Sequence, residues 1–185
     1  MKTNTEELIA QLKSNAVEAF DRLIEQYGDK LYWHIRRVVV NHEDAEDVLQ
    51  ETFVKAYTSI ADFRGENERS LTAWLYRIAT NIAIGVLRKR KKWALSSLDS
   101  LRGDLLATFE QEIEPSADEI VVRLQKAVLA LPTKQRLVFN MRYYDELSFE
   151  QISQATGQSV STLKTNYHYA VQKIKEQVGV IQIDE

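Results

Sequence analysis

Cysteine is absent from the 185-residue sequence, and only two prolines and six glycines occur in it. A chain without cysteine has neither a disulfide framework nor a thiolate metal site, which fits our expectation of a cytoplasmic protein without a metal or cofactor. No apolar run approaches the roughly 18–20 residues that cross a bilayer, so we expect no membrane insertion. The N-terminal residues, Met1–Glu7, open an amphipathic helix rather than a signal peptide.

A strong charge of either sign is also missing. The formal net charge is −3 and the pI is about 5.7, which is not typical of a general nucleic-acid binder. Residues 1–92 carry 15 Lys and Arg against 14 Asp and Glu, residues 93–117 carry 1 against 5, and residues 118–185 carry 8 against 8. A nearly neutral chain can bind DNA through local basic faces, but its non-specific affinity is modest. If this chain binds DNA, a partner must supply most of the affinity.

Apolar residues make up 44% of the chain and recur mostly at three- and four-residue spacing. This periodicity predicts an all-α fold. Capping and turn signals divide it into two small helical domains, residues 1–92 and 118–185, joined by a flexible acidic linker at residues 93–117. The expected helices are 16–40 with a bend near Gly28, 41–60 capped by Asn41, 70–90 capped by Ser70, 105–110, 116–131 with a Ser116/Glu119 capping box, 133–143, 148–157 with a Ser148/Gln151 capping box, and 161–178.

Residues 148–175 carry the clearest motif. A short helix is followed by Gly157-Gln158-Ser159 and a longer helix, which is the pattern of a DNA-reading helix-turn-helix. A helical hairpin with an ordinary solvated face is the alternative. The expected inward stripe of the longer helix is Val160, Leu163, Tyr167, Ala170, Val171 and Ile174. The outward side chains can all donate hydrogen bonds to bases or phosphates, and they are Ser161, Thr162, Lys164, Thr165, His168 and Tyr169.

The helix expected at 41–60 has two different faces. Asp47, Gln50 and Glu51 share a polar face at i, i+3 and i+4, and such a face is usually only solvated. Acid–base or metal chemistry is not supported, because no histidine joins these carboxylates. The residues of this helix that look like core are Val48, Leu49, Phe53, Ala56 and Tyr57.

The following helix joins aromatic residues to a basic run. Trp74 and Tyr76 lead into the run that begins at Arg88 and ends at Lys92. Stacked bases and neutralised phosphates would suit single-stranded DNA at such a surface. The alternative is a core tryptophan with cations at a helix C-terminus. The two interpretations are compatible, since Trp74 can be core while Asn81 and the basic run face DNA.

Together these segments resemble the two conserved domains of extracytoplasmic-function (ECF) sigma factors of the sigma-70 family. Three stretches carry the resemblance in the right order: Asp44–Tyr57, Phe63–Gly65 with Trp74–Asn81, and Leu131–Lys175. The family implies a bundle called region 2, which reads and opens the promoter −10 element, and a region 4 whose helix-turn-helix reads the −35 element. It implies no enzymatic activity, and its partners would be core RNA polymerase (the clamp helices of the largest subunit and the flap), promoter DNA and an anti-sigma factor.

The resemblance also implies roles for individual residues. Asp47, Gln50 and Glu51 match the face that docks on the clamp helices. The loop Arg64–Arg69 matches the segment that holds an extruded base. The residues that match or adjoin −10 contacts are Phe63, Arg64, Ile78, Asn81 and Arg88. The residues expected at the −35 element are the six outward side chains of the helix-turn-helix, among which Lys164, Thr165, His168 and Tyr169 match family positions.

Three departures qualify the resemblance. The loop before Trp74 is slightly longer than usual, so its base preference does not transfer. Gly85 stands where an aspartate is frequent. Asn166, Tyr169 and Val171 replace positions that are often arginine, which predicts fewer phosphate contacts and a shallower salt dependence for the isolated domain.

Three other classes of protein agree less well with the sequence than a sigma factor does. A stand-alone regulator would need a sensing domain with a ligand pocket or a phospho-acceptor aspartate on an α/β fold, and the helical N-terminal half offers neither. An enzyme would need clustered histidines and carboxylates, but His34, His42 and His168 are scattered. A purely protein-binding adaptor would leave the outward donors of the last helix unexplained.

Overall fold

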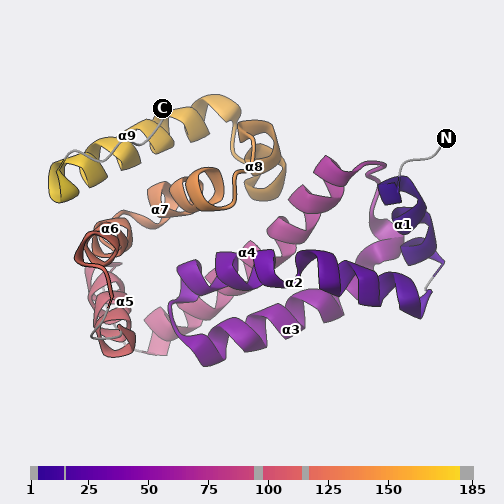
Figure 1. The fold of residues 1–185 in the computed structure, drawn as a ribbon, viewed down its shortest axis with the longest axis horizontal. Coiled ribbons are helices and arrows are strands. Elements are labelled where there is room, and N and C mark those ends of the chain that lie inside the picture. The colour runs from indigo at the N-terminus through magenta and orange to yellow at the C-terminus, as the bar shows by residue number, and fades with distance from the viewer. Residues whose placement is uncertain (1–3, 15, 94–97, 114–116, 180–185) are drawn as a thin grey trace.

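The computed structural model describes residues 4–14, 16–93, 98–113 and 117–179, and all regular structure within these ranges is helical (Figure 1). The predicted all-α fold is confirmed. The amphipathic helix expected at the N-terminus is α1 (Asn4–Lys13). Its inner face is buried, and Arg22 ties it to the next helix by donating to Oε1 of Gln11 at 3.1 Å and to Oδ1 of Asn4 at 2.9 Å.

The N-terminal part is a bundle of three long helices, α2 (Val17–Val39), α3 (His42–Ser59) and α4 (Glu68–Trp93), which pack on one another. A single 3₁₀ turn, η1 (Ile60–Asp62), follows α3. Helix α2 continues without interruption through Gly28, where we expected a bend. The core of this bundle consists of fully buried apolar side chains at helical spacing, including Leu23, Leu31, Ile35, Val48, Ala56, Leu71, Leu75 and Ala79.

Asparagine side chains cap the starts of both α3 and α4. Asn41 caps α3 as predicted, because its Oδ1 accepts from the backbone N–H of Asp44 at 2.9 Å. The prediction that Ser70 caps α4 is wrong. Asn67 precedes the helix and its Oδ1 accepts from the N–H of Ser70, so Ser70 lies within the first turn. Asn67 is the cap because it stands immediately before the helix and its side chain accepts from a free N–H group of the first turn.

The C-terminal part contains α5 (Leu98–Glu112), α6 (Glu119–Leu129), α7 (Thr133–Phe139), α8 (Phe149–Thr156) and α9 (Val160–Val178). Helix α5 is longer than the short helix we expected within the linker. Asp118, not Ser116, caps α6 through the N–H of Ile120 at 2.8 Å, and Ser116 lies outside the described residues. Helix α7 runs on into a π-helical turn, η2 (Asn140–Tyr144), which the sequence did not indicate.

The two parts of the chain lie against each other rather than apart. Helix α8 packs closely on α4, and η2 contacts α2 (Figure 1). Among the described residues, α4 alone is long and apolar enough by composition to cross a membrane. An 18-residue window within Glu68–Arg90 has a mean hydropathy of 1.2, and 44% of it is buried. Helix α4 packs against α2, α3 and α8.

Candidate nucleic-acid interface

The helix-turn-helix is built by local capping. Ser148 and Gln151 form the predicted reciprocal capping box at the start of α8. Gly157 ends that helix at φ +73°, a left-handed conformation that glycine adopts without strain. Ser159 then caps α9 by accepting from the N–H of Thr162 at 3.1 Å, and Ser153 Oγ donates to the Gln158 carbonyl at 2.7 Å across the turn.

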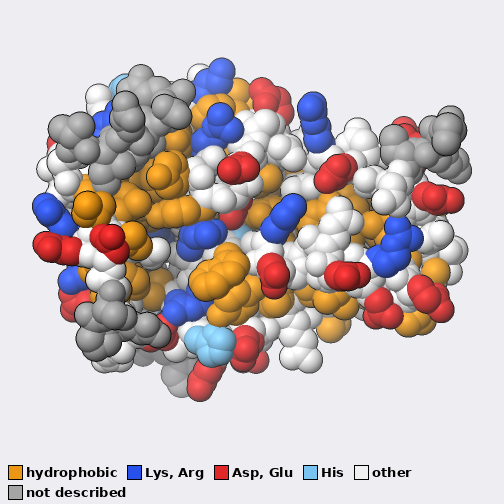
Figure 2. Space-filling model, viewed as in Figure 1, with side chains coloured by type: hydrophobic (Ala, Val, Ile, Leu, Met, Phe, Trp, Pro, Cys, Tyr) orange, Lys and Arg blue, Asp and Glu red, His pale blue; other side chains and the backbone are white. Residues whose placement is uncertain are grey.

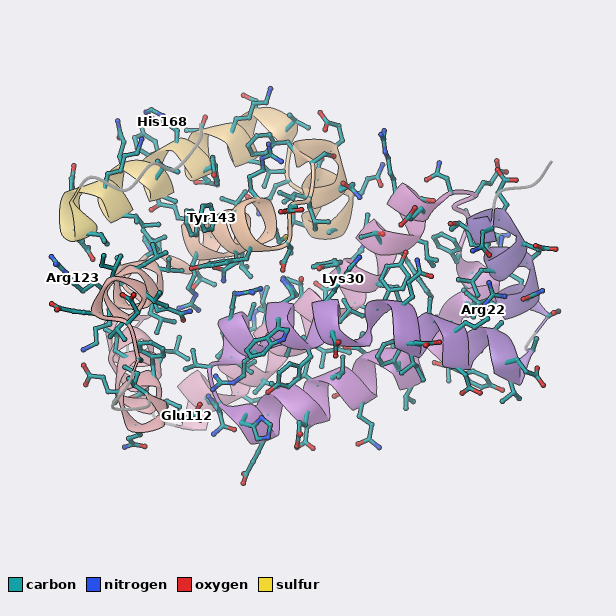
Figure 3. All side chains as sticks on the ribbon, viewed as in Figure 1. Arg22, Lys30, Glu112, Arg123, Tyr143 and His168 are labelled. Carbon is teal, nitrogen blue, oxygen red and sulfur yellow. The ribbon has the colours of Figure 1, made fainter. Side chains whose placement is uncertain are left out.

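Helix α9 separates its residues into two faces. The predicted inward stripe is buried at Leu163, Tyr167, Ala170, Val171 and Ile174, whereas Val160 is only half-buried. Figure 3 shows His168 on the outer side of the helix, away from α7. All six predicted DNA-contacting side chains are exposed: Ser161, Thr162, Lys164, Thr165, His168 and Tyr169. They form one continuous surface that starts at the N-terminus of the helix, where a major groove would receive it.

The loop between η1 and α4 is folded around a buried phenylalanine. The ring of Phe63 is 5% exposed and lies 5.0 Å from that of Trp74. A Cβ atom at Gly65 would come within 2.3 Å of Ser70 Oγ and 2.4 Å of Phe63 Cζ, so only glycine fits this close approach. Arg64 is exposed. In this conformation the buried ring of Phe63 packs between the loop and Trp74. The predicted contact of Phe63 with the −10 element stays a prediction.

The outer face of α4 opens into a groove. Asn81 and Arg88 are exposed, and Ile78 is half-buried one turn earlier. Asn81 and Arg88 line a groove of 520 Å³ whose opposite wall consists of α7, with Lys134, the end of α8, and Gln158 in the turn that follows it. Asn81 and Arg88 therefore face α7 and the start of the helix-turn-helix across this groove, whereas Ile78 does not line it.

The basic run at the end of α4 is divided between structure and surface. Arg90 is paired with Asp44 and donates to the Val39 carbonyl at 3.3 Å. Burial lowers the pKa of the Arg90 guanidinium. Arg88 and Lys89 remain exposed, whereas the side chains of Lys91 and Lys92 lie outside the described residues. Figure 2 shows basic and acidic side chains interspersed over one face of the molecule, in keeping with the small net charge.

The polar face of α3 is fully accessible. Asp47, Gln50 and Glu51 are all exposed and lie side by side at i, i+3 and i+4. Val54 continues the same face at 57% exposure, and Tyr57 is 49% exposed, so the prediction that Tyr57 belongs to the core is wrong. Its ring packs edge-on against Phe20 at 4.7 Å and leaves one side in solvent. An acidic and amide surface bordered by apolar groups suits a protein partner.

Two residues that our sequence analysis did not connect meet between the two parts. His34 is fully buried on α2, and its Nδ1 lies 2.8 Å from Oδ2 of Asp145, which follows η2. The two positions are 111 residues apart, so no local pattern could have linked them. Within the described ranges, no group of three His, Cys, Asp or Glu side chains could hold a metal ion.

The architecture is that of an all-helical DNA-reading protein, with a three-helix bundle followed by a helix-turn-helix. Comparison with protein families matches residues 23–93 to Sigma-70 region 2 and residues 122–174 to Sigma-70, region 4. These matched parts are region 2 and region 4 of the chain.

Full-length relatives agree with the family matches. The chain is 33% identical over 178 residues to the ECF RNA polymerase sigma factor SigW of Bacillus subtilis, covering 92% of this chain and 94% of SigW. It is 30% identical to the RNA polymerase sigma-H factor of Pseudomonas aeruginosa, covering 91% of each. Among solved structures, CnrH in complex with the cytosolic domain of CnrY superposes with a TM-score of 0.67 at 23% identity, covering 92% of this chain and 94% of CnrH, which shows the same fold.

The chain therefore belongs to the ECF sigma factors of the sigma-70 family. It is a sigma factor that directs transcription initiation, as the resemblance implied.

Proposed function

We propose that this chain binds core RNA polymerase and places region 2 on the −10 element and region 4 on the −35 element of one promoter. The observation that carries the proposal is the outer face of α9, where six hydrogen-bonding side chains are exposed opposite a buried apolar stripe. A face with Lys164, Thr165 and His168 in its first three turns can reach base edges and phosphates when the helix enters the major groove.

The proposed division of labour follows the boundaries expected from the sequence. Residues 1–92 dock on the polymerase clamp and read and melt the −10 element, and residues 118–185 read the −35 element and contact the flap. Residues 93–117, with 1 basic against 5 acidic residues, run through the basic interior of the polymerase. The small net charge of the chain supports this arrangement, because polymerase then supplies most of the affinity for DNA.

The clamp-docking surface is the face of Asp47, Gln50 and Glu51. These side chains are exposed and make no ion pair within the described part of the chain, so their interactions remain available to a partner. Charge complementarity at such a surface governs the rate and specificity of association.

The −10 surface combines the loop Arg64–Arg69 with the exposed side of α4. An extruded base is held in the loop, Asn81 and Ile78 border the melted strand, and Arg88 neutralises a phosphate. Phe63 contributes indirectly, because the contact of its ring with Trp74 holds the loop in place. Unstacking a base costs a few kcal/mol, which the loop must offset.

An anti-sigma factor is the third proposed partner. CnrH was solved with the cytosolic domain of CnrY, and a second structural neighbour, RpoE of Bartonella quintana, was solved with the anti-sigma factor NepR. This second neighbour has a TM-score of 0.67 at 20% identity and covers 88% of this chain and 98% of RpoE. As a polymerase subunit the chain would act in the cytoplasm, would have no catalytic activity of its own, and would need no cofactor.

Reconstituted transcription tests the proposal. Purified chain is added to core RNA polymerase, and run-off transcription is measured on genomic fragments. We expect discrete transcripts that depend on the added chain and start at a fixed distance from a shared upstream sequence. Failure of the chain to co-purify with core polymerase and to direct any transcript would refute the proposal.

A further inference from the structure

One buried carboxylate, that of Asp145, joins the two regions. It follows the π-helical turn η2 of region 4, and 3% of its side chain is exposed. Its Oδ2 lies 2.8 Å from Nδ1 of His34, and its Oδ1 accepts from Nη1 of Arg37 at 3.1 Å. Both of these residues belong to α2 of region 2. The side chain of Asp145 therefore bonds across the boundary between the regions, not within region 4.

The surrounding groups hold this carboxylate in place. Nε2 of His34 lies 2.9 Å from Oγ1 of Thr80, which orients the imidazole ring. The guanidinium of Arg37 lies 4.4 Å from the ring centre of Tyr144. Burial, opposed by the charge of Arg37, raises the pKa of the Tyr144 phenol to about 12, so the ring stays neutral beside the ion pair. Removing the carboxylate of Asp145 would leave His34 and Arg37 without their hydrogen-bonding and charged partner at this boundary.

The same boundary contains a buried amide, that of Asn140. Asn140, at the start of η2, is fully buried, and in the described part of the chain its amide oxygen and nitrogen have no hydrogen-bond partner. It lines a cavity of 280 Å³ between α2, α5, α6 and η2. Burying an amide without a partner is unfavourable, and water would reach Asn140 if the regions separated.

The closed arrangement cannot serve both promoter elements at once. The −35 and −10 positions are separated by about 25 base pairs, or roughly 85 Å along B-DNA. In this structure α8 of the helix-turn-helix packs directly on α4, which carries Asn81 and Arg88 (Figure 1). Promoter binding therefore requires the regions to separate.

We propose that Asp145 is an intramolecular latch, which holds region 4 on region 2 in the free chain and is released when core polymerase binds the two regions apart. The latch is a property of the free chain, and only its release by polymerase rests on the proposed function. Polymerase binds only the open form of the chain. The apparent affinity of the chain for polymerase is therefore the affinity of the open form multiplied by the fraction of chain that is open. If the latch keeps nine chains in ten closed, breaking it raises the apparent affinity about tenfold.

Energy transfer between two dyes on the full chain tests the latch. The natural sequence has no cysteine, so Glu25→Cys on α2 and Gln172→Cys on α9, both exposed positions, give two unique labelling sites. We expect a compact, high-transfer population in the parent chain. Asp145→Asn should move most molecules to a low-transfer population while the helical content by circular dichroism stays the same. Arg37→Gln should act in the same direction, and the double variant should add little to either single change.

Glu146→Gln is the matched control, because it removes the same charge one residue further on from an exposed side chain. It should behave like the parent chain. Equal transfer in Asp145→Asn and Glu146→Gln would overturn the latch, and so would loss of helicity in Asp145→Asn, which would assign this residue to the fold of region 4.

Titration with core polymerase separates the latch from the proposed function. Tighter apparent binding by Asp145→Asn than by Glu146→Gln supports the release step, and unchanged binding by an opened chain overturns that step. If neither the parent nor any variant binds polymerase while Asp145→Asn still opens the chain, the latch stands and the proposed function fails.

Discussion

Asn67, the cap of α4, and Ser70, in the first turn of that helix, are joined by reciprocal hydrogen bonds. Oδ1 of Asn67 accepts from the N–H of Ser70 at 3.0 Å, and Oγ of Ser70 accepts from the N–H of Asn67 at 3.2 Å. The same hydroxyl also donates to the Asn67 carbonyl at 2.8 Å. These bonds hold the end of the loop Arg64–Arg69, for which we propose contact with the extruded −10 base, so the helix cap and this loop depend on the same two side chains.

Replacing this cap should weaken the chain and the loop together. We expect Asn67→Ala to lower the free energy of unfolding by about 1 kcal/mol, because a free N–H of the first turn loses its acceptor. Asn67→Asp keeps the acceptor and adds a negative charge at the helix N-terminus, so its stability should be close to that of the parent chain. Urea unfolding followed by circular dichroism measures both. Equal stability of the alanine and aspartate variants would show that the cap contributes nothing.

Two glycines near α4 should respond to alanine in opposite directions. Gly65→Ala places a Cβ within 2.3 Å of Ser70 Oγ, so the loop must move and stability should fall. Gly85→Ala meets nothing within 4 Å and lies inside α4, so it should raise the free energy of unfolding by about 1 kcal/mol through helix propensity.

Thermal unfolding of the two variants measures the difference, and the fluorescence of Trp74, which contacts Phe63, reports loop movement. A spectral change is expected for Gly65→Ala alone. If Gly65→Ala is as stable as the parent chain, the close approach around Gly65 is absent in solution.

Local signals in the sequence predicted much of this fold, because they act over three or four residues. Asn41 as a cap, the Ser148/Gln151 capping box and Gly157 in a left-handed conformation were all recognisable from residue type and spacing. The choice between Asn67 and Ser70 was not, since both are good capping residues and each bonds to the other.

Longer-range features could not be predicted from the sequence. The contact of His34 with Asp145 joins positions 111 residues apart, and it depends on how the two regions pack. Tyr57 has the spacing of a core residue, but it lies at the edge of the bundle with Phe20 on one side only. The candidate site residues came from family positions and from helix faces, and the exposure of α9 agrees with the outward face expected for it.

Reversing the charge of the α3 face should separate folding from polymerase binding. Asp47 and Glu51 are exposed, and exposed charges contribute little to stability. We expect Asp47→Lys with Glu51→Lys to leave helicity and melting nearly unchanged and to weaken core polymerase binding by several kcal/mol. Asp21→Lys with Glu25→Lys, on exposed positions of α2 rather than on the α3 face, controls for net charge. If the Asp47/Glu51 variant assembles with core polymerase as the parent chain does, this face of α3 is not the clamp-docking surface.

Asn81 should act when the promoter opens rather than when duplex DNA is first bound. We expect Asn81→Ala to reduce transcription from duplex promoters more than from templates that are already melted at −10, because a pre-melted template no longer requires the unstacking step. Both templates are transcribed by the same holoenzyme preparation, so differences in assembly cancel. An equal loss on the two templates would assign Asn81 a structural role instead.

The recognition helix offers a test of sequence reading. Lys164, Thr165 and His168 are exposed on one side of α9, and Lys164 lies 5.8 Å from the ring of Phe149, which keeps its ammonium near the start of the helix. Losing a base contact costs about 1–3 kcal/mol and relaxes the preference at one base pair, whereas losing a phosphate contact weakens all sequences alike.

We therefore expect Thr165→Ala or His168→Ala to change the −35 preference at one or two positions while polymerase binding stays intact. Lys164→Ala should also lower the slope of DNA affinity against salt if its ammonium contacts phosphate. The measurement is a −35 library transcribed by parent and variant holoenzymes, with Lys173→Ala, an exposed lysine near the end of α9, as the control. Lys173 donates to Gln135 on α7, so its loss should affect packing of region 4 and not the order of preferred sequences. If Thr165→Ala and His168→Ala both rank the library as the parent does, this face of α9 does not read sequence.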